Sequence, residues 1–175
     1  MTTSPIRLAI NGASGRMGQA LMSLLRSDNR FELAYAVVSP GSTHDGEPVW
    51  FGHPLCQVHD WSKAPALDVV IDFSGPTGLT ATLDHCLAHG IPLVTGTTGL
   101  DASLQARLEA AGSRIALLRA ANFSLGVALL TRLLREAAAA LPDWDLEIVE
   151  AHHGRKQDAP SGTALALGRA AAAAR

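Results

Sequence analysis

Short apolar runs alternate with helical patterns along the first two thirds of the chain. The apolar runs occupy residues 6–10, 31–38, 68–74, 91–99 and 114–120. Strands that alternate with helices of this length predict βαβ units and a parallel sheet, and β-branched apolar strands are typical of a sheet covered on both faces. The pattern predicts an α/β fold with a Rossmann-type, doubly wound parallel sheet.

The helical stretches carry their own start and stop residues. Pro76 stands where a helix can begin, and Gly90 stands where the same helix can end. A further helix is predicted over residues 101–112.

The last third has a different pattern. Residues 124–141 predict a long helix, residues 145–153 a strand and residues 161–175 a final helix. We place a boundary at residues 122–124, between a dinucleotide-binding domain (1–123) and the N-terminal part of an α+β substrate-binding domain (124–175).

Composition narrows the function classes. The 175 residues are 47% hydrophobic and 17% charged, with a formal net charge of −2. The sequence has no basic stripe of the kind that binds nucleic acid. It has no apolar stretch that approaches the roughly 20 residues of a membrane span, and no signal peptide is visible. Cys56 and Cys86 form no Cys-x-x-Cys pattern, which favours a reducing compartment. We expect a cytoplasmic protein with no nucleic-acid or membrane partner.

The first strand runs into a glycine-rich turn. Gly12, Gly15 and Gly18 recur at intervals of three residues between this strand and the next helix. Glycines allow a tight turn and close backbone approach, and the helix N-terminus offers free N–H groups to a pyrophosphate. Arg16 adds a positive charge. The alternative is a glycine-rich turn with no ligand.

The second strand does not end in the usual acidic residue of NAD-binding proteins. No carboxylate follows it before Asp45. Ser39 and Ser42 could donate hydrogen bonds to a 2′-phosphate, together with Arg16, which leans toward NADPH. The cofactor is therefore expected to be NADH or NADPH.

Three further loops follow predicted strands, where ligands of doubly wound sheets bind. They are 72–78, 95–100 and 120–124. Gly96, Thr97 and Thr98 offer small side chains and hydroxyls for a nicotinamide and its ribose, or form an ordinary turn. Asn122 and Phe123 line a cleft, or cap the helix that follows.

The stretch 150–164, EAHHGRKQDAPSGTA, gathers the most chemistry. On a strand His152 and His153 point to opposite faces, and a turn at Gly154 would bring one of them to the same cleft as Lys156. Ser161 is a plausible N-cap. The helix that it begins, with the Thr163 hydroxyl, would hold a carboxylate. A proton donor, a fixed cation and an anion cradle suit a small di-acid that gains a proton.

This stretch, with the turns GASGRMG, GTTG and ANFS, resembles dihydrodipicolinate reductases (4-hydroxy-tetrahydrodipicolinate reductases) of bacterial lysine and diaminopimelate synthesis. The resemblance runs in order over nearly the whole chain. It implies hydride transfer from NADH or NADPH to a cyclic, unsaturated dicarboxylate, giving tetrahydrodipicolinate.

The resemblance also implies roles for individual residues. The catalytic pair would be His152 and Lys156, and the substrate dicarboxylate would be bound by His153, Gly162 and Thr163. The cofactor would be bound by Gly12, Ala13, Ser14, Gly15, Arg16, Met17, Gly96, Thr97, Thr98, Ala120, Ala121, Asn122 and Phe123, with Ser39 at the end of the second strand.

Chains of this family continue beyond the length of this one, and their second domain is an open sheet that builds a homotetramer. We therefore expect an incomplete second domain here. A chain that ends at Arg175 is expected to fold its first domain, to bind cofactor and to show little activity.

Other readings remain open. One is a nicotinamide oxidoreductase acting on an amino acid or a semialdehyde, and another is a dinucleotide-binding fragment or regulatory module without catalysis. We expect no metal site. His53, Cys56 and His59 lack a fourth ligand, and the adjacent His152 and His153 diverge. His85 and His89 are expected to complement the C-terminus of their helix.

Overall fold

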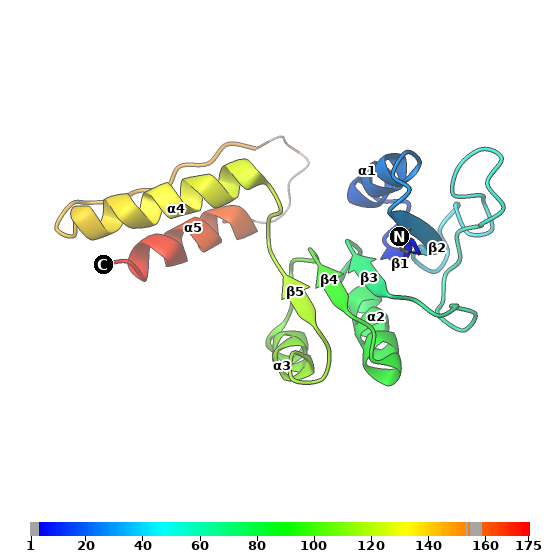
Figure 1. Ribbon diagram of the computed structural model, residues 1–175. Coiled ribbons are helices and arrows are strands. Elements are labelled where there is room, and N and C mark those ends of the chain that lie inside the picture. Colours follow the sequence, from blue (N-terminus) through cyan, green and yellow to red (C-terminus); the bar gives the residue numbers. More distant parts are fainter. Residues whose placement is uncertain (1–3, 153, 155–158) are drawn as a thin grey trace. The chain divides into compact units, whose positions relative to one another are not determined.

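The computed structural model describes residues 4–152, 154 and 159–175. Two of the candidate site residues, His153 and Lys156, lie outside the described residues. The chain divides into two compact units, residues 1–119 and 120–175. In Figure 1 the first unit runs from blue to green and the second from yellow to red.

A parallel sheet forms the centre of the first unit. Its strands are β1 (Ile6–Asn11), β2 (Phe31–Val37), β3 (Val69–Asp72), β4 (Leu93–Thr95) and β5 (Leu117–Arg119). Their order in the sheet is β2-β1-β3-β4-β5. Every pairing is parallel, which confirms the predicted sheet. Because β1 pairs with β2 on one side and with β3 on the other, the order of the strands reverses at β1.

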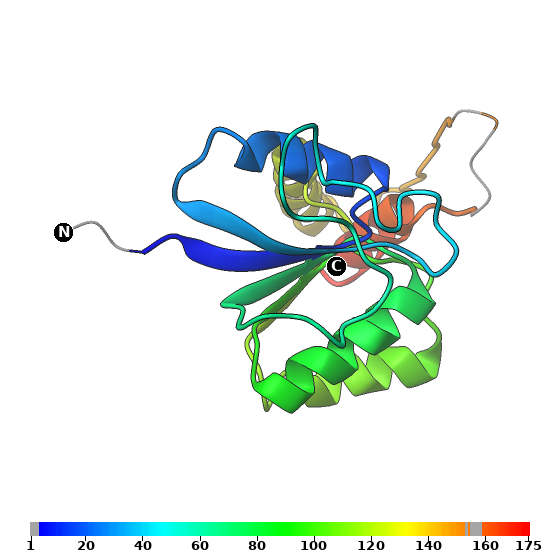
Figure 2. The ribbon, with the colours of Figure 1, turned by 90° about the vertical axis from the view of Figure 1, so that its right-hand side faces the viewer.

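Helices cover both faces of this sheet, as Figure 2 shows, with α1 (Arg16–Leu25) on one face and α2 (Pro76–His89) and α3 (Ala102–Ala111) on the other. Successive strand residues point to opposite faces. Leu8 and Ile10 accordingly pack in the cluster that contains Met22 of α1. Ala9 packs in the cluster that contains Leu83 of α2 and Leu108 of α3. This confirms the doubly wound arrangement.

The helix boundaries follow from local sequence. Pro76 is the first residue of α2, and Gly90 ends this helix in the left-handed conformation, as predicted. Asp101 caps α3, since its side chain accepts a hydrogen bond from the Leu104 amide at 2.7 Å.

The long connection between β2 and β3 returns to the end of β2. Val58 forms a parallel bridge with Val37. Its amide donates to the Ala36 carbonyl at 2.9 Å, and its carbonyl accepts from the Val38 amide at 2.8 Å. A short piece of this connection therefore lies beside β2 like an additional parallel strand.

The second unit contains two helices, α4 (Leu125–Ala140) and α5 (Gly162–Ala172), which contact each other. Ser124 caps α4 and Ser161 caps α5, each accepting a hydrogen bond from an amide of the first turn. The predicted N-cap at Ser161 is confirmed.

The strand predicted over residues 145–153 is not present in its described part, 145–152. A strand needs a partner for its backbone groups, and the described residues of the second unit contain no other strand. The segment nevertheless keeps a two-residue alternation. The Ile148 side chain faces α5, where a Cβ at Gly168 would lie 3.7 Å from its Cδ1, whereas Val149 is 91% exposed.

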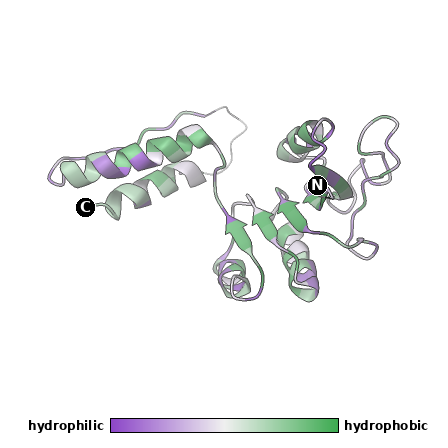
Figure 3. Ribbon diagram, viewed as in Figure 1, coloured by the Kyte–Doolittle hydropathy of each residue, from purple (hydrophilic) through white to green (hydrophobic). Residues whose placement is uncertain are grey.

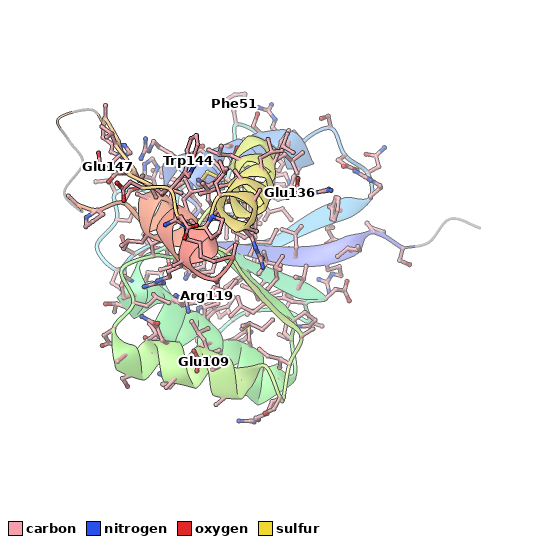
Figure 4. The ribbon with its side chains drawn as sticks, turned by 90° about the vertical axis from the view of Figure 1, so that its left-hand side faces the viewer. Phe51, Glu109, Arg119, Glu136, Trp144 and Glu147 are labelled. Carbon is pink, nitrogen blue, oxygen red and sulfur yellow. The ribbon has the colours of Figure 1, made fainter. Side chains whose placement is uncertain are left out.

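Colouring by hydropathy separates the strands from the second unit. In Figure 3 the strands of the sheet are mostly hydrophobic, whereas α4 mixes hydrophobic and hydrophilic positions. Leu125, Leu129 and Leu133 of α4 are exposed, and so are Trp144 after this helix and Phe51 in the β2–β3 connection, the last two labelled in Figure 4. No helix in the part of the chain that the structure describes is long and apolar enough to cross a membrane.

The glycine turn generates the first prediction. A Cβ on Gly18 would lie 2.2 Å from the Gly12 carbonyl oxygen and 2.6 Å from that of Ala13. Because both are backbone atoms, we expect Gly18→Ala to lower the free energy of unfolding by about 1–3 kcal/mol in urea denaturation. The control is Gly75→Ala, whose Cβ would meet no heavy atom within 4 Å. Equal stability of the two variants would contradict this packing.

Candidate functional site

A cleft of about 600 Å³ opens at the carboxyl ends of β1, β2 and β3. This is the point where the strand order reverses, at which doubly wound sheets bind ligands. The cleft is lined by three loops: the turn after β1, the end of β2 with the segment beside it, and the loop that leads into α2. The lining residues are Asn11, Gly12, Ser14, Gly15, Val37, Val38, Ser39, Pro40, His59, Asp60, Trp61, Phe73, Ser74, Gly75, Pro76, Thr77, Gly78 and Ala81.

The glycine turn has the geometry that a dinucleotide needs. Gly12 has a φ of 82°, and a Cβ on it would lie 2.5 Å from the Phe73 carbonyl oxygen. Gly15 precedes the first turn of α1, and no side chain caps this helix. The N-terminal amides of α1 are therefore available to a phosphate. The residues fit a pyrophosphate group.

A buried carboxylate connects the loops that follow β1, β3 and β4. Asp72 is fully buried at the end of β3. Its oxygens accept hydrogen bonds from Asn11 Nδ2 at 2.7 Å, Ser74 Oγ at 2.8 Å, Thr95 Oγ1 at 3.2 Å and Thr97 Oγ1. All these donors are neutral, and they come from the ends of β1, β3 and β4.

The loop after β4 is fixed by the same network. The Thr97 amide donates to Thr95 Oγ1 at 3.2 Å. Gly96 lies against the Phe73 ring, where a Cβ would come within 2.1 Å of a ring carbon. Gly96 to Thr98 do not line the cleft. They follow β4 at the same edge of the sheet.

A second carboxylate organises the stretch 150–164 in the second unit. Glu150 accepts the Ser161 amide at 2.8 Å through Oε1. Its Oε2 accepts the Ser161 hydroxyl and lies 2.8 Å from His152 Nε2. The hydrogen bonds from His152 and Ser161 lower the pKa of Glu150 to about 2. Glu150 thus links His152 to the N-cap of α5.

The predicted loop 120–124 also contacts the start of α5. Asn122 Nδ2 donates to Thr163 Oγ1 at 3.0 Å, and Asn122 Oδ1 accepts from the Ser124 amide at 2.8 Å. Of the two roles that the sequence left open, the structure shows Asn122 supporting the start of α4.

Comparison with known families covers both units. The N-terminal model of dihydrodipicolinate reductase matches residues 6–123, and the C-terminal model of the same enzyme matches residues 126–175. The chain belongs to the dihydrodipicolinate reductase family.

Individual members of the dihydrodipicolinate reductase family support this assignment. The 4-hydroxy-tetrahydrodipicolinate reductase of Xanthomonas campestris pv. campestris (strain B100) is 51% identical over 171 residues, which are 98% of this chain and 71% of the relative. The enzyme of Xylella fastidiosa (strain 9a5c) is 49% identical over 95% of this chain and 69% of its own.

Solved structures share the fold. A dipicolinate-bound dihydrodipicolinate reductase from Paenisporosarcina sp. TG-14 superposes with a TM-score of 0.76 at 28% identity, over 98% of this chain and 67% of its own. Aspartate semialdehyde dehydrogenase II of Vibrio cholerae superposes with a TM-score of 0.50 at 13% identity, over 79% of this chain and 47% of its own. The second likeness shows a shared fold only.

The structure places some of the predicted cofactor residues in the cleft and others outside it. Gly12, Ser14, Gly15 and Ser39 line the cleft. Ala13 is buried beneath the turn, and the exposed Arg16 and Met17 begin α1 outside the cleft lining. Residues 120–123 belong to the second unit. Gly162 and Thr163, which are predicted to bind the substrate, are the first residues of α5.

Sequence reasoning missed Asp72, Asn11 and Glu150. A carboxylate at the end of an apolar, buried strand is the feature that could have revealed Asp72, because a buried carboxylate needs several donors. Glu150 lies at the start of the recognised stretch, but its bond to Ser161 spans eleven residues and depends on tertiary structure.

Of the two histidines at the end of α2, one lies as expected and the other does not. His89 Nδ1 contacts the His85 carbonyl at 2.9 Å, as expected for a helix C-terminus. His85 instead stacks on Trp61 with ring centroids 4.7 Å apart, and burial, followed by the nearby His89, lowers its pKa. Among the described residues, no group of three or more His, Cys, Asp or Glu side chains is placed to hold a metal ion.

The Asp72 network generates the second prediction. Asp72→Asn replaces one acceptor oxygen by an N–H₂ group that faces other donors. We expect it to lower the free energy of unfolding by about 1–3 kcal/mol and to weaken dinucleotide binding, as measured by urea denaturation and calorimetry. Asp84→Asn, which removes only an exposed contact with Arg107, is the control and should change stability by less than about 1 kcal/mol. An unchanged Asp72→Asn variant would show that the network does not hold the loops.

Glu150 generates the third prediction. Because its pKa is lowered from 4.5 to about 2, its contribution to stability is complete above pH 4.5 and is lost as the pH falls toward 2. We expect the ¹³C carboxyl resonance of Glu150 to titrate with a midpoint near 2. Ser161→Ala should raise the midpoint toward 4.5, and Thr163→Val should leave it unchanged. A midpoint near 4.5 in the native chain would contradict the contacts of Glu150.

Proposed function

We propose that this protein reduces 4-hydroxy-tetrahydrodipicolinate to tetrahydrodipicolinate with NADH or NADPH, in diaminopimelate and lysine synthesis. Hydride and one proton are added and water is released. The observation that carries the proposal is that one chain combines a dinucleotide-type turn at the reversal point of its sheet with the stretch 150–164 of this family.

The first unit binds the cofactor. Gly12 to Met17 hold the pyrophosphate through the amides at the start of α1, helped by the Arg16 charge. Ser39 contacts the adenosine end. Gly96 to Thr98 hold the nicotinamide end. The resemblance implies that residues 120–123 also bind the cofactor. When bound, the reduced nicotinamide supplies the hydride.

The second unit binds the substrate. Gly162 and Thr163 open α5, where the first-turn amides and the Thr163 hydroxyl suit one carboxylate of a small dicarboxylate. His153 is proposed to bind the same substrate. The hydrogen bond from Asn122 to Thr163 orients the hydroxyl.

His152 is the proposed acid/base and Lys156 the proposed proton donor. Glu150 lies 2.8 Å from His152 Nε2, which leaves Nδ1 as the ring nitrogen that exchanges a proton. Hydride addition to a conjugated imine builds up negative charge. A lysine ammonium near this charge stabilises the transition state more than the ground state.

The resemblance extends the proposal to a homotetramer in the cytoplasm, with residues 1–123 as the dinucleotide-binding domain and 124–175 as part of the substrate-binding domain. The exposed leucines of α4 support burial against further protein.

The second candidate is a dinucleotide-binding regulatory module that lacks catalysis. This candidate is favoured by residues 145–152, which form no strand and so leave the second unit without a sheet among its described residues. Oxidation of NADH and NADPH with freshly generated 4-hydroxy-tetrahydrodipicolinate separates the two functions. Substrate-dependent oxidation supports the reductase. Cofactor binding without turnover and without affinity for pyridine-2,6-dicarboxylate supports the module.

The fourth prediction concerns Lys156. Lys156→Ala is expected to keep the dissociation constant for the cofactor and to lower kcat roughly 10²–10⁴-fold, the usual effect of removing a proton donor. Arg132→Ala removes an exposed charge paired with Glu136 at 3.1 Å and should leave kcat unchanged. Normal turnover by Lys156→Ala would refute the assignment.

A further inference from the structure

No acidic residue stands at the end of β2, but the segment beside it contains one, Asp60, that lines the cleft. The parallel bridge between Val37 and Val58 sets the register, and the two backbones continue in the same direction. His59 and Asp60 follow Val58, just as Val38 and Ser39 follow Val37. All four residues line the same cleft.

Aromatic packing holds this segment in place. The Tyr35 hydroxyl of β2 donates to the Asp60 carbonyl at 3.1 Å. The neighbouring Trp61 packs on Tyr35 and His85, with ring centroids 5.8 Å and 4.7 Å apart. The segment that contains Asp60 is therefore attached to β2 through the Asp60 carbonyl and to α2 through Trp61.

The Asp60 carboxylate is ionised and accessible. Its Oδ1 accepts the Ser62 amide at 2.7 Å and the Ser62 hydroxyl at 2.6 Å. These bonds lower the pKa of Asp60, with smaller effects of His59 and Lys63. Its Oδ2 lies 3.7 Å from His59 Nε2, and the side chain is 51% exposed.

The charges of the cleft near Asp60 disfavour the 2′-phosphate that distinguishes NADPH from NADH. Among the described lining residues, Asp60 is the acidic one and His59 the basic one, and neither lysine nor arginine lines the cleft. His59 is itself engaged by Asp45, at 2.6 Å from Nδ1. A 2′-phosphate carries a charge of about −1.5 to −2 at neutral pH and would meet the Asp60 carboxylate at an end of the cleft that neither lysine nor arginine lines.

We propose that Asp60 determines cofactor specificity, accepting a hydrogen bond from a hydroxyl of the adenosine ribose and selecting NADH over NADPH. The inference rests on the proposed placement of the dinucleotide in the cleft. It reverses the preference for NADPH suggested by Ser39 and Ser42, since Ser42 does not line the cleft. Carboxylate recognition of the ribose diol is the usual basis of NAD selection. Here the carboxylate comes from outside β2.

The test compares two cofactor fragments that differ only in the phosphate. Binding of ADP-ribose and of 2′-phospho-ADP-ribose to the 175-residue chain is measured by calorimetry, which needs no turnover. We expect ADP-ribose to bind at least about tenfold more tightly. Asp60→Asn, which keeps the side-chain shape and an acceptor for Ser62, should reduce the ratio to about threefold or less, chiefly by improving binding of the phosphorylated fragment.

The control is Asp84→Asn, which removes an exposed carboxylate of α2 outside the cleft and should leave the ratio unchanged. Circular dichroism confirms that both variants are folded. Equal or tighter binding of the phosphorylated fragment by the native chain overturns the inference but leaves the cofactor site intact. An unchanged ratio of the two affinities in Asp60→Asn also overturns the inference and leaves the cofactor site intact. Failure of both fragments to bind the native chain overturns the proposed cofactor site and the inference with it.

Discussion

The carboxylate of Asp72 is the constraint on which the first unit depends. It is fully buried, and a buried carboxylate is tolerated only when its oxygens are satisfied by donors. Asn11, Ser74, Thr95 and Thr97 provide them. Because these residues lie at the ends of β1, β3 and β4, one side chain fixes the loops that follow these three strands relative to one another.

The second unit repeats this arrangement on a smaller scale. Glu150 joins His152 to Ser161, and Ser161 caps the helix whose first residues are proposed to bind a carboxylate. In both units a carboxylate orders the backbone of a proposed ligand site. Binding energy is then not spent on ordering the loops when the ligand arrives.

The sequence predicted the sheet and its helices because their cause is local. The signals that predict them are the alternating apolar runs and the helix ends at Pro76 and Gly90, and each signal is contained in a few neighbouring residues. The strand at 145–153 was wrong in its described part, because a strand depends on a partner that local pattern does not reveal. The Asp72 network and the presence of Asp60 in the same cleft as Ser39 were not predicted, for a related reason. Each joins residues distant in sequence, through the sheet or through a parallel bridge.

The most direct test of the account follows a single hydrogen. NADH or NADPH labelled with deuterium on the transferred position of nicotinamide C4 is mixed with the protein and freshly generated 4-hydroxy-tetrahydrodipicolinate, and the product is analysed by mass spectrometry. The account predicts tetrahydrodipicolinate that carries one deuterium on a ring carbon, in amounts equal to the cofactor oxidised. Bound cofactor that is not oxidised in the presence of substrate, or product without the label, would contradict it.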